Sequence, residues 1–329
     1  MELREFCPGA RCVFDRDPAI RITDVPPSET TRWRAVVRVL RSPIDSLSCA
    51  LLPSSCALCG SPLPRLSAIP ICDACWTEFP LQNGAVCACC GDALNAPAGT
   101  LAAPLCRACR MAPPAFVRAV SYGPYNGRMR EAIHALKYDG LHPAARGLGK
   151  LLAQAIAQLA GEAPARMLVV PVPLHRSKYS RRGFNQSRSL AVEALRFLRK
   201  SYPQWHLKLA PSSLIRLRAT ESQAGLTPRQ RRLNVRGAFS VADPALVKQQ
   251  NILVVDDILT TGATARAAAL ALTRAGAASV WVATLARAQR ATGFGRGLEY
   301  LEETQSPEAA MQTESLGSDS ASMREQPSF

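Results

Sequence analysis

Two adjacent carboxylates that follow an apolar run are the residues of this 329-residue chain best suited to chemistry. The run Ile252–Val255 is rich in β-branched residues, which is typical of a buried parallel strand. Asp256 and Asp257 would then lie at the carboxyl end of that strand, where open α/β sheets place their ligands. The turn Thr260–Thr264 would present backbone N–H groups and hydroxyls at a helix N-terminus, a cradle for a phosphate monoester. Carboxylates beside such a cradle predict a sugar phosphate, with the acids on the ribose hydroxyls.

The same stretch, from Asn251 to Thr264, resembles the phosphoribosyl pyrophosphate (PRPP) motif of type I phosphoribosyltransferases. By this resemblance, Asp256 and Asp257 hold the ribose 2′- and 3′-hydroxyls of PRPP. The resemblance also assigns the 5′-phosphate to the loop residues Thr260, Thr261, Gly262, Ala263 and Thr264. The alternative is an ordinary strand–turn–helix unit whose acids are only solvated.

Eight cysteines predict two metal sites. They form four C-x2-C pairs with similar spacing: Cys56/Cys59, Cys72/Cys75, Cys87/Cys90 and Cys106/Cys109. One such turn places two thiolates on one side of a zinc ion, and a second turn completes the tetrahedron. We therefore expect two structural Zn²⁺ ions, with sequential and cross-braced pairing both open. Redox disulfides and an iron–sulfur cluster are the alternatives, and Cys89 could compete with Cys90 as a ligand.

A basic segment follows a second apolar strand, predicted at Met167–Val172. We expect a loop here, and we assign its four cations to the pyrophosphate end of the donor: Arg176, Lys178, Arg181 and Arg182. Gly183 would let the backbone approach a ligand, and Asn185 would cap the helix Asn185–Arg199. The alternative is a solvated basic turn.

A second polar segment separates the strands predicted at Leu214–Leu217 and Ala238–Val241. In phosphoribosyltransferases a mobile segment between two strands closes over the donor and excludes water, which would otherwise hydrolyse it. Arg218 and Gln223 are the residues of this segment that we assign to the donor.

Strands and helices alternate from Ala115 onward. We expect an entry strand at Ala115–Tyr122, helices at Arg128–Tyr138, Leu148–Leu159 and Ala263–Ala275, and a final strand at Ser279–Leu285. This alternation predicts an α/β fold with a mainly parallel sheet and crossover helices.

Composition divides the chain into four parts. We expect a partly disordered extension at 1–47, a double zinc ribbon at 48–112, the α/β domain at 113–290 and a disordered acidic tail at 291–329. The net charge is +15, yet seven acids and one arginine from position 298 onward contribute −6, which leaves +21 on the rest. Such a body attracts phosphates, nucleotides or nucleic acid, although generic surface arginine would give the same charge.

The sequence contains no apolar run of 18 residues and no basic-then-apolar signal at its start. We therefore expect no stable membrane insertion and a cytoplasmic location. Disulfides are rare in that compartment, which favours metal over disulfides for the cysteine pairs.

Several motifs, taken in order along the chain, resemble the ComF family. These are the C-x2-C-Gly opening, Lys137-Tyr138, Pro171 to Leu174, Arg182 to Gln186, Gln223 with Leu226, Arg232 to Phe239 and Asp256 to Thr264. Members join a zinc-ribbon region to a type I phosphoribosyltransferase domain, and the match spans about Ser48 to Ala288. Eight paired cysteines resemble the double-ribbon form of the family.

The resemblance implies binding of PRPP, or a related sugar phosphate, with Mg²⁺ and transfer of its phosphoribosyl group to an unidentified nucleophile. It also implies a role in natural competence, with single-stranded DNA and DNA-uptake proteins as partners. The alternative is a non-catalytic module that binds nucleotide and single-stranded DNA, with cations and stacking aromatics. The aromatic candidates are Trp76, Phe79, Tyr122, Tyr125, Tyr179 and Phe184.

Overall fold

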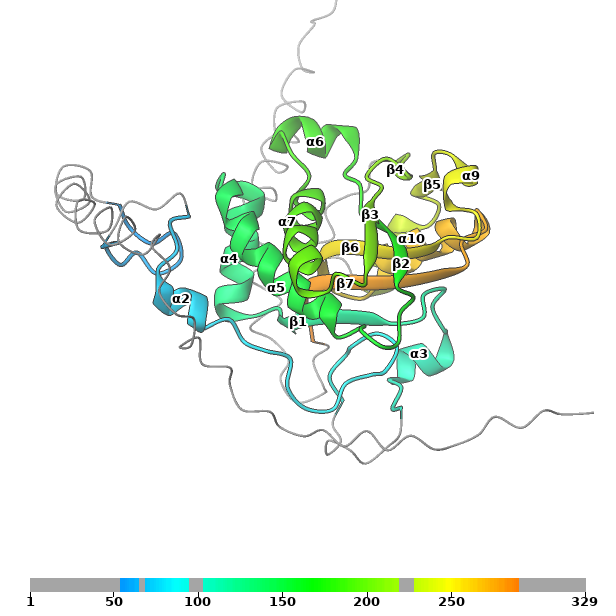
Figure 1. Ribbon diagram of the computed structural model, residues 1–329, viewed down its shortest axis with the longest axis horizontal. Helices are drawn as coiled ribbons and strands as arrows, with labels where there is room; N and C mark the ends of the chain where they lie inside the picture. Colours follow the sequence, from blue (N-terminus) through cyan, green and yellow to red (C-terminus); the bar gives the residue numbers. More distant parts are fainter. Residues whose placement is uncertain (1–53, 65–68, 95–102, 219–227, 290–329) are drawn as a thin grey trace, which may run out of the picture. The chain divides into compact units, whose positions relative to one another are not determined.

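The computed structural model describes residues 54–64, 69–94, 103–218 and 228–289 (Figure 1). All of them belong to one compact unit that begins at Ser54. The predictions for the N-terminal extension, for the acidic tail and for Gln223 fall outside these residues. No helix in the described ranges combines the length and the apolar character needed to cross a membrane.

A five-stranded parallel sheet forms the centre of this unit, in the order β1-β7-β6-β2-β3. The strands are β1 (Ala119–Pro124), β2 (Arg166–Pro171), β3 (His206–Leu209), β6 (Asn251–Leu259) and β7 (Ser279–Arg287). Parallel neighbours require crossover connections, and helices supply them here. The predicted α/β class with a parallel sheet is confirmed.

Both faces of the sheet are buried, as the apolar run at its centre predicted. On β6, Leu253 and Val255 pack on one face, whereas Ile252 and Val254 pack on the other. The first face is covered by α4 (Gly127–Tyr138), α5 (Ala145–Ala157) and α7 (Gln186–Ser201), and the second by α10 (Ala263–Arg274). A short 3₁₀ turn, η1 (His142–Ala144), joins α4 to α5.

A separate antiparallel ribbon pairs β4 (Leu214–Arg216) with β5 (Phe239–Val241). These strands lie where the sequence placed them, and α8 (Pro228–Val235) lies between them in the chain. The helix α9 (Pro244–Val247) follows. The segment expected to close over a donor therefore starts and ends on one ribbon, and its residues 219–227 are outside the described ranges.

Several elements differ from the sequence prediction, among them the basic segment and an edge strand. The basic segment is a helix, α6 (Arg176–Arg182), and not a loop. The His175 side chain accepts a hydrogen bond from the Ser177 amide and caps its first turn, and Gly183, at φ 74°, ends it. The edge strand β3 was not predicted, because four residues are too few for the alternation of two leucines with His206 and Lys208 to stand out.

Each cysteine region contributes to the core on one face of the sheet. Cys56 and Cys75 pack into the core beneath α4, α5 and α7, and α2 (Asp73–Thr77) carries Cys75. Cys87, Cys90, Cys106 and Cys109 pack into the core beneath α10, and α3 (Arg107–Met111) carries Cys109. The sheet therefore lies between the two cysteine groups.

Candidate functional site

The acid pair lies in an extension of the central strand. β6 pairs with β2 only as far as Val255, but β7 stays beside it up to Leu259. Asp256 and Asp257 thus continue the strand beyond the end of β2, whereas the sequence placed them just after the strand. Because neighbours in a strand point to opposite faces, the two carboxylates meet different surroundings.

Asp257 forms a buried ion pair with a lysine from α4. Its Oδ2 lies 2.8 Å from Lys137 Nζ, and its Oδ1 accepts a hydrogen bond from the Ile258 amide at 2.9 Å. Burial alone would raise the pKa of Asp257, but the Lys137 ammonium outweighs it and the pKa lies below the usual range. The same pairing raises the pKa of Lys137 against the opposing effect of burial. Asp257 is therefore ionised near neutral pH.

Asp256 is in the opposite situation. Its Oδ1 accepts hydrogen bonds from Ser187 Oγ at 2.9 Å and from the Asp257 amide at 3.0 Å. Burial, together with the negative charge of Asp257, raises the pKa of Asp256 to about 7, although these hydrogen bonds oppose the rise. One carboxyl of the pair therefore titrates near neutrality while its neighbour stays charged.

The loop that follows has the form of an anion cradle. Gly262 adopts a left-handed conformation at φ 76° and precedes the first residue of α10, Ala263. Thr261 Oγ1 accepts a hydrogen bond from the Ala263 amide at 3.3 Å, so the turn is closed by its own side chain. A residue with a Cβ would be strained at Gly262. The predicted phosphate loop thus sits at a helix N-terminus, directly after the acid pair.

Arg182, one of the four cations assigned to pyrophosphate, interacts electrostatically with the acid pair. Its Nη2 donates to the Tyr138 hydroxyl at 2.9 Å, and its guanidinium lies 4.7 Å from the centre of the Tyr138 ring. Its charge also helps to lower the pKa of Asp257. Arg176, Lys178 and Arg181 share α6 with it.

Arg216, the last residue of β4, interacts electrostatically with the acid pair, whereas Arg218 lies two residues beyond that strand and has other partners. Arg218 donates to the carbonyls of Asn234 and Arg236, at 3.0 and 3.2 Å, and so holds the end of α8. Burial lowers the pKa of Arg216, and the charge of Asp256 opposes that change, which makes Arg216 an electrostatic neighbour of the pair.

Four residues at the site were not assigned from the sequence: Lys137, Tyr138, Ser187 and Arg216. Lys137 and Tyr138 stood in one of the family motifs, and that was the one signal that could have found them. No spacing in the sequence relates Ser187 or Arg216 to the acid pair.

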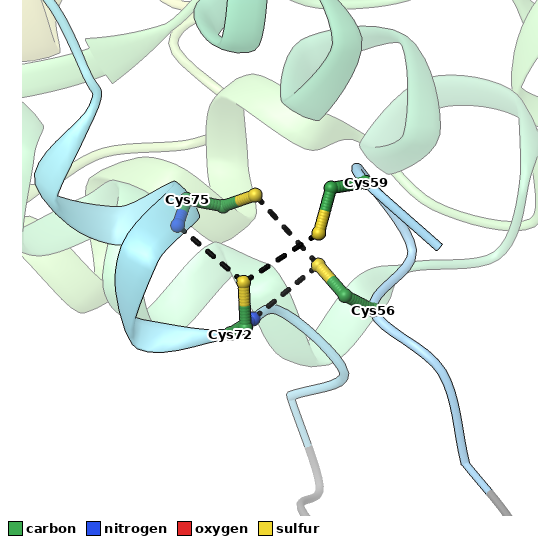
Figure 2. Close-up of side chains that lie close together, drawn as sticks. All are labelled: Cys56, Cys59, Cys72 and Cys75. Atoms are coloured by element: carbon green, nitrogen blue, oxygen red, sulfur yellow. Dashed lines mark hydrogen bonds between the residues drawn. The ribbon is translucent and has the colours of Figure 1, made fainter. Parts of the chain in front are cut away.

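Cys56, Cys59, Cys72 and Cys75 form the first four-cysteine cluster (Figure 2). The sulfur atoms of Cys56 and Cys75 are 3.8 Å apart, and those of Cys59 and Cys72 are 3.6 Å apart. A tetrahedral ion with bonds of about 2.3 Å to sulfur separates its ligands by about 3.8 Å. A disulfide needs about 2.0 Å. The Cys72 amide also donates to Cys56 Sγ at 3.3 Å. The cluster could therefore hold a zinc ion.

The second cluster repeats this geometry with Cys87, Cys90, Cys106 and Cys109, and all four are buried. Cys90 and Cys106 place their sulfurs 3.7 Å apart, and the Cys106 amide donates to Cys87 Sγ at 3.3 Å. Each cluster joins successive C-x2-C pairs, so the arrangement is sequential and not cross-braced. Cys90, and not Cys89, belongs to the cluster. The Cys89 carbonyl instead accepts a hydrogen bond from the Ala119 amide at the start of β1.

Comparisons with known proteins identify the family of this chain. Residues 212–313 match the family model described as phosphoribosyl transferase domain. DNA utilization protein YhgH of Salmonella typhi is 34% identical over 238 residues, which cover 72% of this chain and 98% of that protein. Competence protein F of Haemophilus influenzae is 28% identical over 186 residues, covering 56% of this chain and 78% of that protein.

A solved structure of the allosteric regulatory enzyme of purine biosynthesis aligns with a TM-score of 0.27 and 24% identity, over 44% of this chain and 26% of that one. The family assignment rests on the likeness to YhgH, which spans nearly the whole of that relative. Together with the family match and the observed sheet, it shows that this chain belongs to the ComF family and contains a type I phosphoribosyltransferase domain.

Proposed function

We propose that the protein binds PRPP, or a related sugar phosphate, at the carboxyl end of β6. The observation that carries this proposal is the order of groups along one strand–loop–helix unit: two carboxylates, then a left-handed glycine, then the first amides of α10. Carboxylates accept hydrogen bonds from ribose hydroxyls, and helix N-terminal amides hold phosphate. This order of groups suits a ribose 5-phosphate, which carries its ring hydroxyls at one end and its phosphate at the other.

Each group then has a task in donor binding. Asp256 and Asp257 take the ribose hydroxyls, with Lys137 keeping Asp257 charged and in place. The 5′-phosphate lies on the loop Thr260–Thr264. Arg182, with Arg176, Lys178 and Arg181 on the same helix, faces the pyrophosphate. Mg²⁺ arrives with the donor. Because Asp257 is engaged by Lys137, Asp256 is the acid of the pair better able to approach the ion, which prefers oxygen ligands.

The reaction we propose is transfer of the phosphoribosyl group to an unidentified nucleophile. The bond from ribose C1 to the pyrophosphate oxygen breaks, and its electron pair leaves with pyrophosphate. The nucleophile then forms a new bond to C1. The cations of α6 stabilise the leaving group, and orienting the partners can supply about 7–11 kcal/mol of the barrier. The segment between β4 and β5 would exclude water from the donor.

The relatives suggest where this activity is used. They are named DNA utilization protein and Competence protein F, and we propose a role in DNA uptake in the cytoplasm for this chain as well. The two cysteine clusters would hold structural zinc, within a double zinc ribbon at 48–112 that precedes the transferase domain at 113–290.

A second candidate function is binding of nucleotide and single-stranded DNA without chemistry. The observation that favours it is Tyr179, which is 48% exposed on the cationic helix α6. It borders a cavity of about 360 Å³ that is also lined by His142, Phe184 and Arg188. Aromatic rings beside cations are a stacking surface for bases. Steeply salt-dependent binding of an oligothymidine, reduced in Tyr179→Ala, would support this candidate, and salt-independent binding would exclude it.

The test of the donor site is calorimetric titration of the metal-loaded protein with PRPP and Mg²⁺. We compare the wild type with Asp256→Asn and with a matched control, Asp243→Asn. Asp243 is an exposed helix cap, and asparagine caps equally well. Loss of a charge-assisted hydrogen bond should weaken binding roughly 10- to 100-fold in Asp256→Asn and leave the control unchanged. Equal affinity in all three proteins, or no binding at millimolar PRPP, would refute the proposal.

A further inference from the structure

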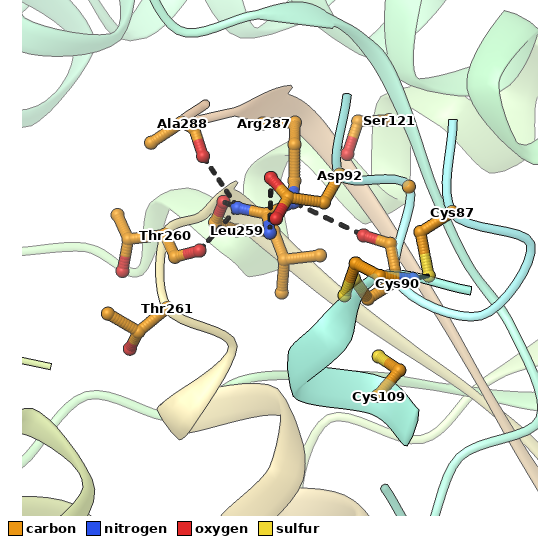
Figure 3. Close-up of polar contacts among 12 residues, drawn as sticks. Cys87, Cys90, Asp92, Cys109, Ser121, Leu259, Thr260, Thr261, Arg287 and Ala288 are labelled. Carbon is orange, nitrogen blue, oxygen red and sulfur yellow. Dashed lines mark hydrogen bonds and ion pairs between the residues drawn. The ribbon is translucent and has the colours of Figure 1, made fainter. Parts of the chain in front are cut away.

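Arg287, the last residue of β7, is the largest fully buried side chain of the described residues, and it is charged. Its Nη2 pairs with Asp92 Oδ1 at 3.0 Å, and Asp92 is itself buried. Its other contacts are backbone carbonyls, which Figure 3 shows around the guanidinium: Cys90 at 3.2 Å, Leu259 at 2.8 Å, Ala288 at 2.6 Å, and Thr260. A buried guanidinium is costly unless it is paired and fully hydrogen-bonded, so this arrangement is a built feature of the fold.

On one side the guanidinium holds the start of the phosphate loop. Leu259 is the last residue of β6, and Thr260 is the first residue of the loop. In a planar trans peptide the C=O and the following N–H point in opposite directions. Fixing the carbonyls of Leu259 and Thr260 toward Arg287 therefore turns the amides of Thr260 and Thr261 away from it. A cation on the carbonyl also polarises the peptide and makes its N–H a stronger donor.

On the other side the guanidinium holds the second cysteine cluster. Cys90 is a ligand-position cysteine, and Asp92 lies two residues further along the same tight turn. In that turn the Cys87 amide donates to the Asp92 carbonyl at 2.8 Å, and the Gly91 amide donates to the Cys87 carbonyl at 2.9 Å. An ion that fixes Cys87 and Cys90 would thus fix the two groups that Arg287 contacts.

A second arginine makes a parallel connection to the same cluster. Arg266, in the first turns of α10, donates to the Ala112 carbonyl at 2.6 Å and lies 3.7 Å from Cys109 Sγ. Its own amide donates to the Gly262 carbonyl in the phosphate loop. Among the described contacts, none of these kinds links the first cluster to the phosphate loop. Arg128 of α4 instead contacts the first cysteine region, through the Leu58 carbonyl at 3.0 Å and Glu78 at 3.1 Å.

We infer that Arg287 is a positioning residue that sets the 5′-phosphate loop against the second cysteine cluster. Metal in the second cluster, and not in the first, then holds the loop amides in their anion-binding orientation. This inference rests on the proposed donor site for its functional consequence, but its structural content is independent of any ligand. Arg287 contacts no reacting group, since it acts through the peptides of Leu259 and Thr260.

The first experiment compares Arg287→Lys with Arg128→Lys by hydrogen–deuterium exchange of the zinc-loaded full chain. Lysine keeps the charge but loses the planar fork that reaches several carbonyls at once. We expect exchange in residues 259–266 to rise at least about tenfold in Arg287→Lys only, with exchange in α7 unchanged and zinc content equal to wild type. Wild-type exchange at 259–266 in Arg287→Lys would overturn the inference. So would a rise that spreads equally to α7, because Arg287 would then serve general stability.

The second experiment separates the two metal sites with Cys87→Ser and Cys56→Ser, which replace the first ligand of each cluster. Exchange at 259–266 should rise in Cys87→Ser and remain at the wild-type rate in Cys56→Ser. The same rate in both variants would overturn the inference. PRPP titrations of wild type and Arg287→Lys complete the test, with at least about a tenfold loss expected in the variant. If the wild type binds no PRPP, the proposed function fails while the exchange data still decide the role of Arg287.

Discussion

At the scale of residues, the main feature of the site is that two adjacent carboxyl groups have different pKa values. Lys137 keeps Asp257 ionised, whereas burial and the neighbouring charge push the pKa of Asp256 to about 7. A ribose hydroxyl or a magnesium ion interacts best with the ionised form of Asp256. Donor binding should therefore displace a proton from this carboxyl.

The corresponding prediction concerns pH. The free protein holds the Asp256 proton below about pH 7, and binding removes it, so PRPP affinity should rise as pH increases through 7 and then level off. The slope cannot exceed about tenfold per pH unit for one proton. Calorimetry in two buffers of different ionisation enthalpy measures the proton released. Asp256→Asn should release fewer protons than wild type, because only the phosphate groups of PRPP then contribute. Equal proton release by the two proteins would contradict the assignment.

Site residues could be predicted from the sequence where they lie close together along the chain. Asp256, Asp257 and Gly262 stand in one continuous stretch, so their order alone indicated acids followed by an anion cradle. Ser187 and Arg216 come to the pair from α7 and β4, and only the fold brings them there. Arg218 was assigned to the donor from its place in the polar segment, and its guanidinium donates to the carbonyls of Asn234 and Arg236.

At the scale of elements, buried strands and long helices were predictable because their apolar periodicity is strong. β6 and α10 lie where the sequence placed them, although β6 continues to Leu259 because β7 accompanies it. α6 and β3 were missed for local reasons. The N-terminus of α6 is capped by a histidine side chain, which is not among the preferred capping residues. β3 is a short edge strand that buries side chains on one face only.

The close packing of α5 against α7 makes an element-scale prediction. A Cβ added at Gly149 would lie 2.4 Å from Glu193 Cβ and 3.1 Å from the Ala194 nitrogen, so the helix backbones themselves would have to separate. Gly149→Ala gains roughly 1 kcal/mol of helix propensity but loses about 1–3 kcal/mol to overpacking. We expect net destabilisation in urea unfolding. The exposed neighbour Lys150→Ala is the control, and a stabilised Gly149→Ala would contradict the observed packing.

At the scale of the whole described unit, the two cysteine clusters lie on opposite faces of the sheet and differ in access to solvent. Cys59 is exposed and Cys72 partly so, whereas all four cysteines of the second cluster are buried. Which C-x2-C pairs combine to form each cluster could not be derived from their spacing alone. The face of the sheet that each cluster occupies also depends on long-range contacts, such as that of Arg287 with Asp92.

This difference predicts two phases of zinc loss. A chelator should take the ion from the first cluster at least roughly tenfold faster than the ion from the second, because the second requires local opening of the core. A colorimetric chelator assay measures both phases. Cys56→Ser should lack the fast phase and Cys87→Ser the slow one. A single phase that releases both ions would argue against the two environments.

The most direct measurement of the central claim is a crystal structure of the protein with PRPP and Mg²⁺. We predict the 5′-phosphate on the amides of Thr260–Thr264 and the ribose hydroxyls on Asp256 and Asp257, with the pyrophosphate toward Arg182. Asp257 should keep its contact with Lys137, and Arg287 should keep its hydrogen bonds to the carbonyls of Leu259 and Thr260. A donor bound elsewhere, or one that leaves the acid pair and the loop untouched, would contradict the proposed site.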